Sequence, residues 1–160
     1  MHTSDLDKNL LSKFKDIRLL ALDVDGVLTD GSIIYGNAGE EIKVFNVKDG
    51  LGIRLLSKAG IPICVITGRR STALRHRCDN LKIEYLYDGI RDKTSILPIL
   101  EKESGILSHE IAFMGDDLPD LPLMKIIGLP VSVADARPEV IEVADWVTSA
   151  KGGAGAVREV

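Results

Sequence analysis

Residues 17–30 read IRLLALDVDGVLTD, an apolar run that leads into two aspartates, Asp23 and Asp25, and then Gly26. The run 17–24 has the length and composition of a buried strand. Ligands of open parallel sheets bind beyond the carboxyl ends of strands, which is where the aspartates fall. Two carboxylates at such an end repel each other and lose hydration, so they indicate a bound cation. Taken alone, the segment could also be a polar turn with exposed aspartates.

Further apolar runs follow the first one, and stretches with helical periodicity lie between most of them. These runs span residues 61–67, 83–87, 111–114, 131–134 and 146–148. Strands that alternate with helices predict a parallel sheet covered on both faces. The expected fold class is therefore α/β, with three layers and a Rossmann-like parallel sheet.

Residues that favour helix ends support this alternation. Ser71 can begin one helix, and Pro138 fits the first turn of another. Asp49 can cap a helix that ends at Gly60. A cap at residues 4–5 would begin a short amphipathic helix ahead of the first strand.

One segment departs from the alternation of strands and helices. Residues 32–35 and 41–47 are rich in β-formers, and the turn sequence GNAG separates them at 36–39. We expect a β-hairpin over about residues 32–47 that projects from the sheet. No stretch of the chain is long enough to form a separate cap domain.

The length and the C-terminal composition complete the expected organisation. A chain of 160 residues has the usual size of one domain, so we expect a single domain over 1–160. Residues 151–160 are glycine-rich, which predicts a flexible tail.

The overall charge narrows the classes of partner. A formal net charge of -4 gives no basic field for nucleic acid. The first fifteen residues contain charged side chains and no long apolar segment, so we expect neither a signal peptide nor a membrane span. Cys64 and Cys78 lack metal or redox spacing and are expected as reduced, packed thiols. These features favour the cytoplasm.

Two more polar motifs follow apolar runs. Thr67 and a glycine follow one run, where a hydroxyl and free backbone N–H groups can receive phosphate oxygens. Residues 115–120 read GDDLPD and follow another run, which adds carboxylates to the same rim. Each motif alone is more often a simple turn, and Lys93 alone is more often a surface lysine. Together the aspartates call for a divalent ion with oxygen ligands, and Mg²⁺ is the expected cofactor.

The order Asp-x-Asp, Thr-Gly, Lys and Gly-Asp-Asp, each after its own strand, resembles the haloacid dehalogenase superfamily of phosphohydrolases. The resemblance spans almost the whole chain. It implies that Asp23 attacks phosphorus and that Asp25 acts as general acid and then as general base. It also implies that Thr67 and Lys93 hold the phosphoryl oxygens.

The same resemblance implies a ligand set for Mg²⁺. The carboxylates of Asp23 and Asp116 and the backbone carbonyl of Asp25 would bind the ion. Asp117 and Asp120 would not bind the ion themselves but would orient the residues that do.

The hairpin, residues 43–54 and the C-terminal residues 152–160 are similar to the capless phosphatases of this superfamily, in particular those acting on eight-carbon sugar-acid phosphates. This resemblance implies a homotetramer in which a neighbour's hairpin and tail help to cover each site. Basic side chains suit a substrate with a carboxylate and a phosphate. The implied substrate contacts are Asp25, Asn46, Val47, Lys48, Asp49, Gly50, Arg54, Arg69, Arg77 and Lys93.

Other hypotheses about the function remain open at this point. A phosphatase for a nine-carbon sugar-acid 9-phosphate would carry nearly the same motifs. A catalytically silent subunit that serves assembly is a reading of a different class, because a fold does not imply a function. The joint presence of Asp23, Asp25, Thr67, Lys93 and Asp116 argues against that hypothesis, since a silent copy needs none of these costly buried charges. A phosphomutase is disfavoured by the lack of a cap.

Overall fold

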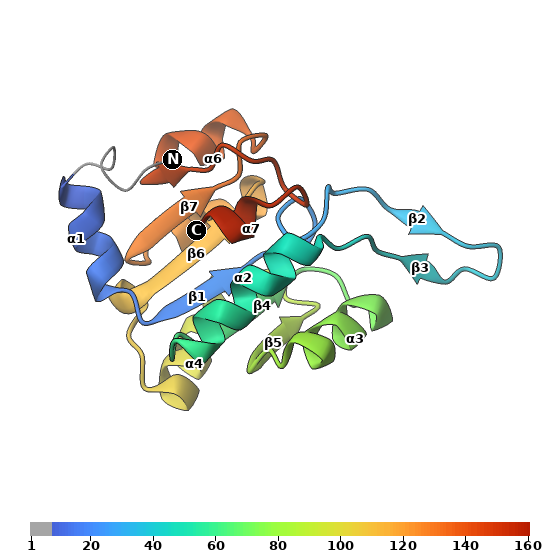
Figure 1. Cartoon of the computed structure of the whole chain (residues 1–160), viewed down its shortest axis with the longest axis horizontal. Coiled ribbons are helices and arrows are strands. Elements are labelled where there is room, and N and C mark those ends of the chain that lie inside the picture. The colour runs from blue at the N-terminus through green and yellow to red at the C-terminus, as the bar shows by residue number, and fades with distance from the viewer. Residues whose placement is uncertain (1–7) are drawn as a thin grey trace.

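The computed structural model describes residues 8–160 and has a six-stranded sheet at its centre, in which all paired strands are parallel (Figure 1). The strand order is β5-β4-β1-β6-β7-β8. The strands are β1 Leu19–Leu22, β4 Ile63–Thr67, β5 Tyr85–Asp88, β6 Ile111–Gly115, β7 Leu129–Ser132 and β8 Trp146–Val147. Every residue of β1, β4, β6 and β7 is buried, so both faces of the sheet are covered. The α/β fold class is confirmed.

Helices connect the strands and cover the sheet. They are α1 Lys8–Asp16, α2 Val47–Lys58, α3 Thr72–Leu81, α4 Leu97–Ser104, α5 Leu121–Met124, α6 Pro138–Val143 and α7 Ala156–Glu159. Figure 1 shows α2 lying across one face of the sheet with α7 beside it. None of the helices within residues 8–160 combines the length and apolarity that a membrane span requires.

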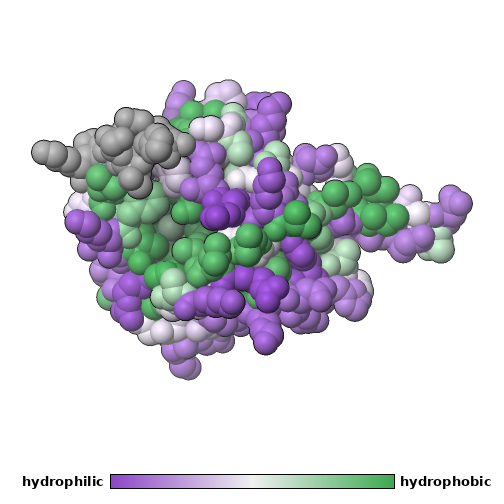
Figure 2. Space-filling view, in the orientation of Figure 1, coloured by the Kyte–Doolittle hydropathy of each residue, from purple (hydrophilic) through white to green (hydrophobic). Residues whose placement is uncertain are grey.

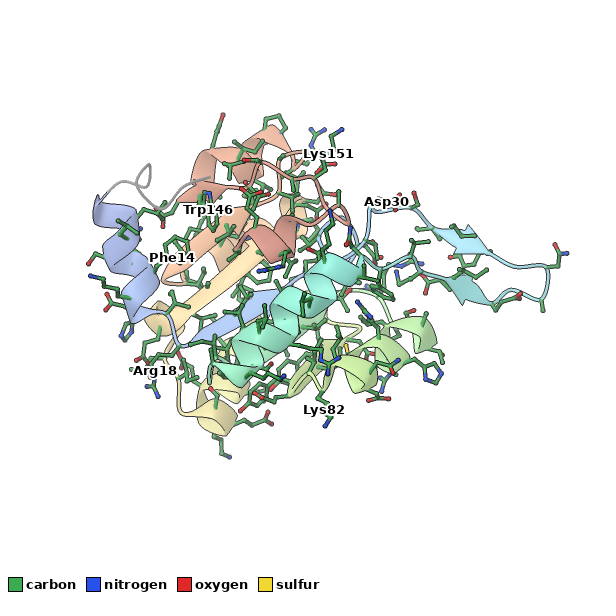
Figure 3. All side chains as sticks on the ribbon, viewed as in Figure 1. Phe14, Arg18, Asp30, Lys82, Trp146 and Lys151 are labelled. Carbon is green, nitrogen blue, oxygen red and sulfur yellow. The ribbon has the colours of Figure 1, made fainter. Side chains whose placement is uncertain are left out.

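Aromatic packing holds α1 at the edge of the sheet. The rings of Phe14 and Trp146 meet edge to face with centroids 5.3 Å apart (Figure 3). This geometry is the one that aromatic pairs prefer. It attaches the first described helix to β8, at the opposite end of the sheet from β5.

The helix ends agree with two of the sequence predictions and correct a third. Ser71 caps α3, its hydroxyl accepting from the backbone N–H of Leu74 at 3.4 Å, and Pro138 begins α6. The predicted cap at Asp49 is wrong, because α2 begins earlier and is capped by Asn46. The predicted cap at residues 4–5 lies outside the described residues.

The hairpin is present and shorter than predicted. Its strands, β2 Ile34–Tyr35 and β3 Glu41–Ile42, pair antiparallel and project from the domain (Figure 1). The predicted second strand reached residue 47, but Asn46 accepts from the backbone N–H of Lys48 at 2.8 Å and begins α2 there. A local cap therefore ends the extended segment before the β-rich pattern does.

The prediction of a flexible C-terminal tail is wrong, because residues 152–159 are packed. A Cβ on Gly152 would lie 1.7 Å from the carbonyl oxygen of Gly26, so only glycine allows this approach to the loop after β1. The backbone N–H of Gly153 donates to the carbonyl of Val27 at 2.9 Å. Val157, in α7, is buried in the core. The glycines serve close backbone contact here, which composition alone does not distinguish from flexibility.

Candidate active site

A pocket of about 380 Å³ lies at the carboxyl ends of the central strands. It brings together eight of the residues singled out in the sequence, from four separate segments of the chain. They are Asp23, Asp25, Thr67, Arg69, Lys93, Asp116, Asp117 and Asp120. Gly68, Ile90, Arg91 and Pro119 complete its lining.

Lys93 links two carboxylates at the bottom of this pocket. Its Nζ lies 2.6 Å from Oδ1 of Asp23 and 2.5 Å from Oδ1 of Asp120. All three side chains are buried, and burial of charges is tolerated only when they are paired and hydrogen-bonded. Burial alone would lower the pKa of Lys93, but Asp23 and Asp120 raise it, so the ammonium stays charged.

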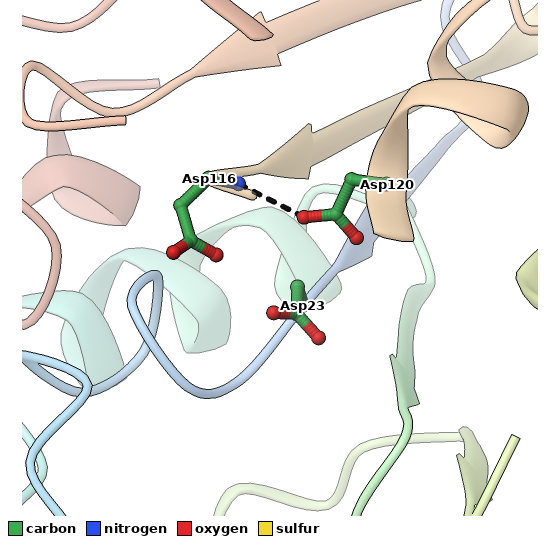
Figure 4. Close-up of side chains that lie close together, drawn as sticks. All are labelled: Asp23, Asp116 and Asp120. Carbon is green, nitrogen blue, oxygen red and sulfur yellow. Dashed lines mark hydrogen bonds between the residues drawn. The ribbon is translucent and has the colours of Figure 1, made fainter. Parts of the chain in front are cut away.

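Asp116 and Asp120 follow β6 and face Asp23 at the end of β1 (Figure 4). One carboxylate oxygen from each lies within 4.8 Å of the others. Asp120 Oδ2 accepts from the backbone N–H of Asp116 at 2.9 Å, which fixes the turn after β6. Gly26, at φ +101°, packs so closely that a Cβ there would lie 2.0 Å from Asp116 Oδ2. The glycine therefore makes room for the third carboxylate.

Crowding changes the acidity of this group. Burial, and then the charges of Asp23 and Asp120, raise the pKa of Asp116 to about 8. Burial also raises the pKa of Asp23 to about 6, against the lowering effect of Lys93. Without a cation, Asp116 is therefore mostly protonated near neutral pH, and ionisation of Asp23 is harder than for an exposed aspartate. A divalent ion between these oxygens would remove the conflict.

Thr67 ends β4 opposite Asp23 and is buried. Its hydroxyl accepts from the backbone N–H of Arg69 at 3.3 Å, which curves the chain around the strand end. On the other side of the pocket, Asp117 caps the turn after β6 by accepting from the backbone N–H of Leu118 at 2.7 Å. Neither segment is an ordinary surface turn, because both line the pocket.

The carboxylate of Asp25 lies where the pocket meets the base of the hairpin. Oδ1 accepts from the ammonium of Lys43, and Oδ2 lies 3.7 Å from Nε of Arg69. Lys43 and Arg69 both contact Glu41, at 3.2 and 3.1 Å. Our reading of the sequence missed Lys43 and Glu41 as site residues. Their i, i+2 spacing in an extended segment, which places both on one side, is the signal that could have found them.

Seven of the expected substrate contacts lie outside this chain's own pocket: Asn46, Val47, Lys48, Asp49, Gly50, Arg54 and Arg77. Most of them gather at the beginning of α2. Arg77 donates to the backbone carbonyl of Asn46 at 3.1 Å and lies over the ring of Phe45. Val47 is 80% exposed.

Asp49 has a contact that was not anticipated. It is buried, and its Oδ1 accepts from the backbone N–H of Arg158 at 2.9 Å. Its carboxylate thus binds the beginning of α7, where backbone N–H groups lack partners within the helix. The side chain holds the C-terminal segment against α2.

Ile90 and Arg91 line the pocket from the loop after β5 and were also missed. The backbone N–H of Ile90 donates to the carbonyl of Thr67 at 2.9 Å, which joins this loop to the end of β4. Their position, directly after a strand and before Lys93, is a signal that could have found them.

Comparisons with known proteins agree with this arrangement. A family model described as haloacid dehalogenase-like hydrolase matches residues 90–159. The 3-deoxy-D-manno-octulosonate 8-phosphate phosphatase of Escherichia coli K12 is 48% identical over 152 residues, which cover 95% of this chain and 81% of that protein. The protein of the same name from Yersinia pestis is 47% identical over the same length.

Solved structures give the same result. The crystal structure of 3-deoxy-D-manno-octulosonate 8-phosphate phosphatase from Yersinia pestis matches with a TM-score of 0.94 and 45% identity, covering 96% of this chain and 83% of that one. The Moraxella catarrhalis phosphatase, in complex with magnesium, phosphate and KDO, matches with a TM-score of 0.92 and 41% identity, over 99% and 88% of the two chains. This chain belongs to the haloacid dehalogenase-like hydrolases, within the family of the 3-deoxy-D-manno-octulosonate 8-phosphate phosphatases.

Proposed function

We propose that this protein hydrolyses 3-deoxy-D-manno-octulosonate 8-phosphate to the free sugar acid and phosphate, through an aspartyl-phosphate on Asp23. The observation that carries the proposal is the cluster of Asp23, Asp116, Asp120 and Lys93 beyond the strand ends, in which Asp116 is half-buried and the others are buried. Such a cluster is unfavourable without a function, because it places three carboxylates beside one ammonium in the protein interior. The name of the relatives supports the choice of substrate.

Mg²⁺ is the proposed cofactor, bound by the carboxylates of Asp23 and Asp116 and the backbone carbonyl of Asp25. The donors fit a hard cation, since all are oxygens. Among residues 8–160, Asp116 Oδ1 is buried and finds no hydrogen-bond partner, so it has a free lone pair for a ligand. Asp120 orients Asp116, and Asp117 caps the same turn. When bound, the ion lowers the repulsion between an anionic nucleophile and an anionic phosphate.

In the first half of the reaction, a carboxylate oxygen of Asp23 attacks phosphorus and forms the acyl phosphate bond. The bond from phosphorus to the sugar oxygen breaks, and Asp25 gives its proton to that oxygen. Lys93 holds Asp23 in a fixed direction through their 2.6 Å contact. Lys93 and the Thr67 hydroxyl then hold the phosphoryl oxygens.

In the second half, water attacks the phosphorus of the aspartyl-phosphate. Asp25, now a carboxylate, takes a proton from this water. The bond between phosphorus and the Asp23 oxygen breaks, which releases phosphate and restores the nucleophile. One residue thus serves both half-reactions because leaving oxygen and water approach from the same side.

The sugar acid would bind on the hairpin side of the pocket. Arg69, which contacts the hairpin, and Arg91 both line the pocket, and guanidinium groups suit a carboxylate. We assign the contacts at the beginning of α2, together with Arg77, to substrate bound in a neighbouring subunit. This assignment explains why those residues lie outside their own chain's pocket.

The assembly that we propose is a homotetramer of single-domain chains in the cytoplasm, where the reaction would supply a lipopolysaccharide precursor. Exposed apolar side chains on the hairpin continue along α2, and Figure 2 shows this as a band across one face. The band comprises Ile33, Ile34, Tyr35, Ile42, Val44, Val47, Leu51 and Leu55. A contiguous apolar surface of this kind is typical of protein–protein contacts.

The test is phosphate release from a panel of sugar phosphates with Mg²⁺, repeated with EDTA. We expect Mg²⁺-dependent release with preference for 3-deoxy-D-manno-octulosonate 8-phosphate. Preference for a nonulosonate 9-phosphate would keep the mechanism and replace the substrate. No release from any substrate would contradict the proposal and favour a catalytically silent assembly subunit.

A further inference from the structure

Lys43, at the base of the hairpin, is enclosed between two carboxylates. Its Nζ donates to Asp25 Oδ1 and lies 3.2 Å from Glu41 Oε1. The Lys43 side chain is only 1% exposed, whereas lysines are almost never buried unless their charge is paired. The ammonium therefore has a fixed position, which a solvated surface lysine would lack.

Asp25 accepts a hydrogen bond through one carboxylate oxygen only. Among the residues described, Oδ2 of Asp25 is buried and has no hydrogen-bond partner. The nearby Nε of Arg69, at 3.7 Å, is beyond hydrogen-bond distance and is also unpartnered. Asp25 lines the pocket. Lys43 thus fixes one oxygen of the carboxylate and leaves the other free to exchange a proton.

Glu41 fixes both cations that flank Asp25. Its Oε1 contacts Nζ of Lys43 at 3.2 Å and Nη2 of Arg69 at 3.1 Å. The same Nη2 donates to the hydroxyl of Tyr35 on the other hairpin strand at 3.3 Å. Both strands therefore contribute to a network that ends on Asp25. A pair that merely attached the hairpin to the domain would not need to include the residue that moves the proton.

We propose that Lys43, oriented by Glu41, is a positioning residue for Asp25 in both proton transfers. The inference rests on the proposed function, because it takes the acid and base role of Asp25 from it. Lys43 acts through Oδ1, so that Oδ2 points to the leaving oxygen in the first half-reaction and to water in the second. The hairpin of a chain is then part of that chain's own catalytic apparatus.

The experiment compares Lys43→Met with wild type on two phosphate esters of different leaving group. The sugar of a sugar phosphate leaves as an alkoxide, which needs a proton. The aryl group of p-nitrophenyl phosphate leaves as a stable phenolate, which needs none. In single-turnover cleavage, we expect Lys43→Met to slow the sugar phosphate about 10- to 100-fold, because a small misplacement of a catalytic group has effects of this size. We expect cleavage of the aryl phosphate to change by less than about 3-fold, since Asp25 gives no proton there.

Matched variants separate positioning from folding. Lys43→Arg keeps the charge and should recover most of the sugar phosphate rate, whereas Glu41→Gln should give a smaller loss of the same kind. Lys58→Met, at an exposed lysine, is the control and should match wild type. Equal losses on both esters, or a rise in KM alone, would show that Lys43 only supports the hairpin or binds substrate, and would overturn the inference.

A double-mutant cycle tests whether Lys43 acts through Asp25. In an Asp25→Asn background, Lys43→Met should change steady-state turnover of the aryl phosphate, which includes the water step, by less than about 2-fold. A further large loss would contradict the inference. If wild type is active and Lys43→Met is unchanged, only this inference fails. If wild type releases no phosphate from either ester, the proposed function fails as well.

Discussion

The acidic centre and the hairpin carry charges on two sides of the same pocket, but they are supported in different ways. Asp23, Lys93 and Asp120 follow β1, β5 and β6 of the sheet, and their side chains are buried. The hairpin has strands of two residues and exposes Ile34, Tyr35 and most of its other apolar side chains. A two-stranded hairpin is only marginally stable alone.

The difference in support matches a difference in function between the acidic centre and the hairpin. Groups that form or break bonds need fixed positions, and strand ends of a buried sheet provide them. Contacts with a large substrate or with a second subunit can lie on a weakly supported element such as the hairpin, because binding of the partner orders that element. Only the charged base of the hairpin, at Lys43 and Glu41, shares the burial of the acidic centre.

The largest effect is expected where the acidic centre loses its nucleophile. Asp23→Asn should lower kcat by about 10⁴-fold or more, because the amide cannot form the acyl phosphate. Thermal unfolding should change little, since Asn has the shape of Asp, Lys93 keeps its 2.5 Å contact with Asp120, and the repulsion between Asp23 and Asp116 is removed. Phosphate release and calorimetry measure the two properties, with Asp79→Asn at an exposed position as the control. Activity close to that of wild type would refute the mechanism.

The next effect concerns the cation. Asp116→Asn should weaken the apparent Mg²⁺ affinity by at least about 100-fold. Even mutation of residues that only hydrogen-bond to metal ligands lowers metal affinity about 10- to 100-fold. Titration of activity with Mg²⁺ measures this affinity. An unchanged Mg²⁺ requirement would remove Asp116 from the ligand set and would weaken the contrast between centre and hairpin.

The pH dependence of the free energy of unfolding follows from Asp116 and Asp23. The pKa of Asp116 is raised to about 8 and that of Asp23 to about 6, so the metal-free folded state binds more protons than the unfolded state between about pH 4 and 8. The free energy of unfolding must then fall as pH rises through this range. We expect the metal-free Tm to be lower at pH 8 than at pH 5, and Mg²⁺ to remove most of the difference. A metal-free Tm that rises over this interval would contradict the assignment.

The exposed apolar part of the hairpin should affect the assembly of subunits, whereas its charged base acts on the chemistry. Val44→Asp places a charge at a side chain that is 67% exposed within the apolar band. We expect light scattering to report smaller species than for wild type, because a charge in an apolar interface must be desolvated. Asn37→Asp adds the same charge at the turn and should keep the assembly. If wild type itself is monomeric, the proposed tetramer is wrong.

The smallest effect is expected at the contact between α2 and α7. Asp49→Ala removes the acceptor for the backbone N–H of Arg158 and frees the beginning of α7. Loss of such a capping contact costs about 1 kcal/mol of the free energy of unfolding. Chemical denaturation measures this change, and an unaltered midpoint would mean that α7 is held by its apolar contacts alone.

Local patterns were sufficient for much of this molecule. The apolar runs predicted the strands of the sheet, but β1, β4 and β5 begin two residues after their predicted starts and β7 two residues before. Ser71 and Pro138 were found because a cap is a property of a few adjacent residues. The cap at Asp49 was predicted wrongly because two residues that can cap a helix, Asn46 and Asp49, lie three residues apart. Asn46 is the cap, and the carboxylate of Asp49 instead accepts from the backbone of α7.

Local patterns predict the α/β alternation and place Asp23, Thr67 and Asp116 after strands, and parallel strands bring their carboxyl ends to one edge. The roles of the glycine-rich end and of Lys43 depend on contacts between distant segments. Gly152 looks the same in a flexible tail as in a backbone contact with Gly26, and the contact spans more than a hundred residues of sequence. The spacing of Glu41 and Lys43 indicates that they share one side of the strand, but only the folded chain brings Lys43 to Asp25, 18 residues away in sequence, and buries it.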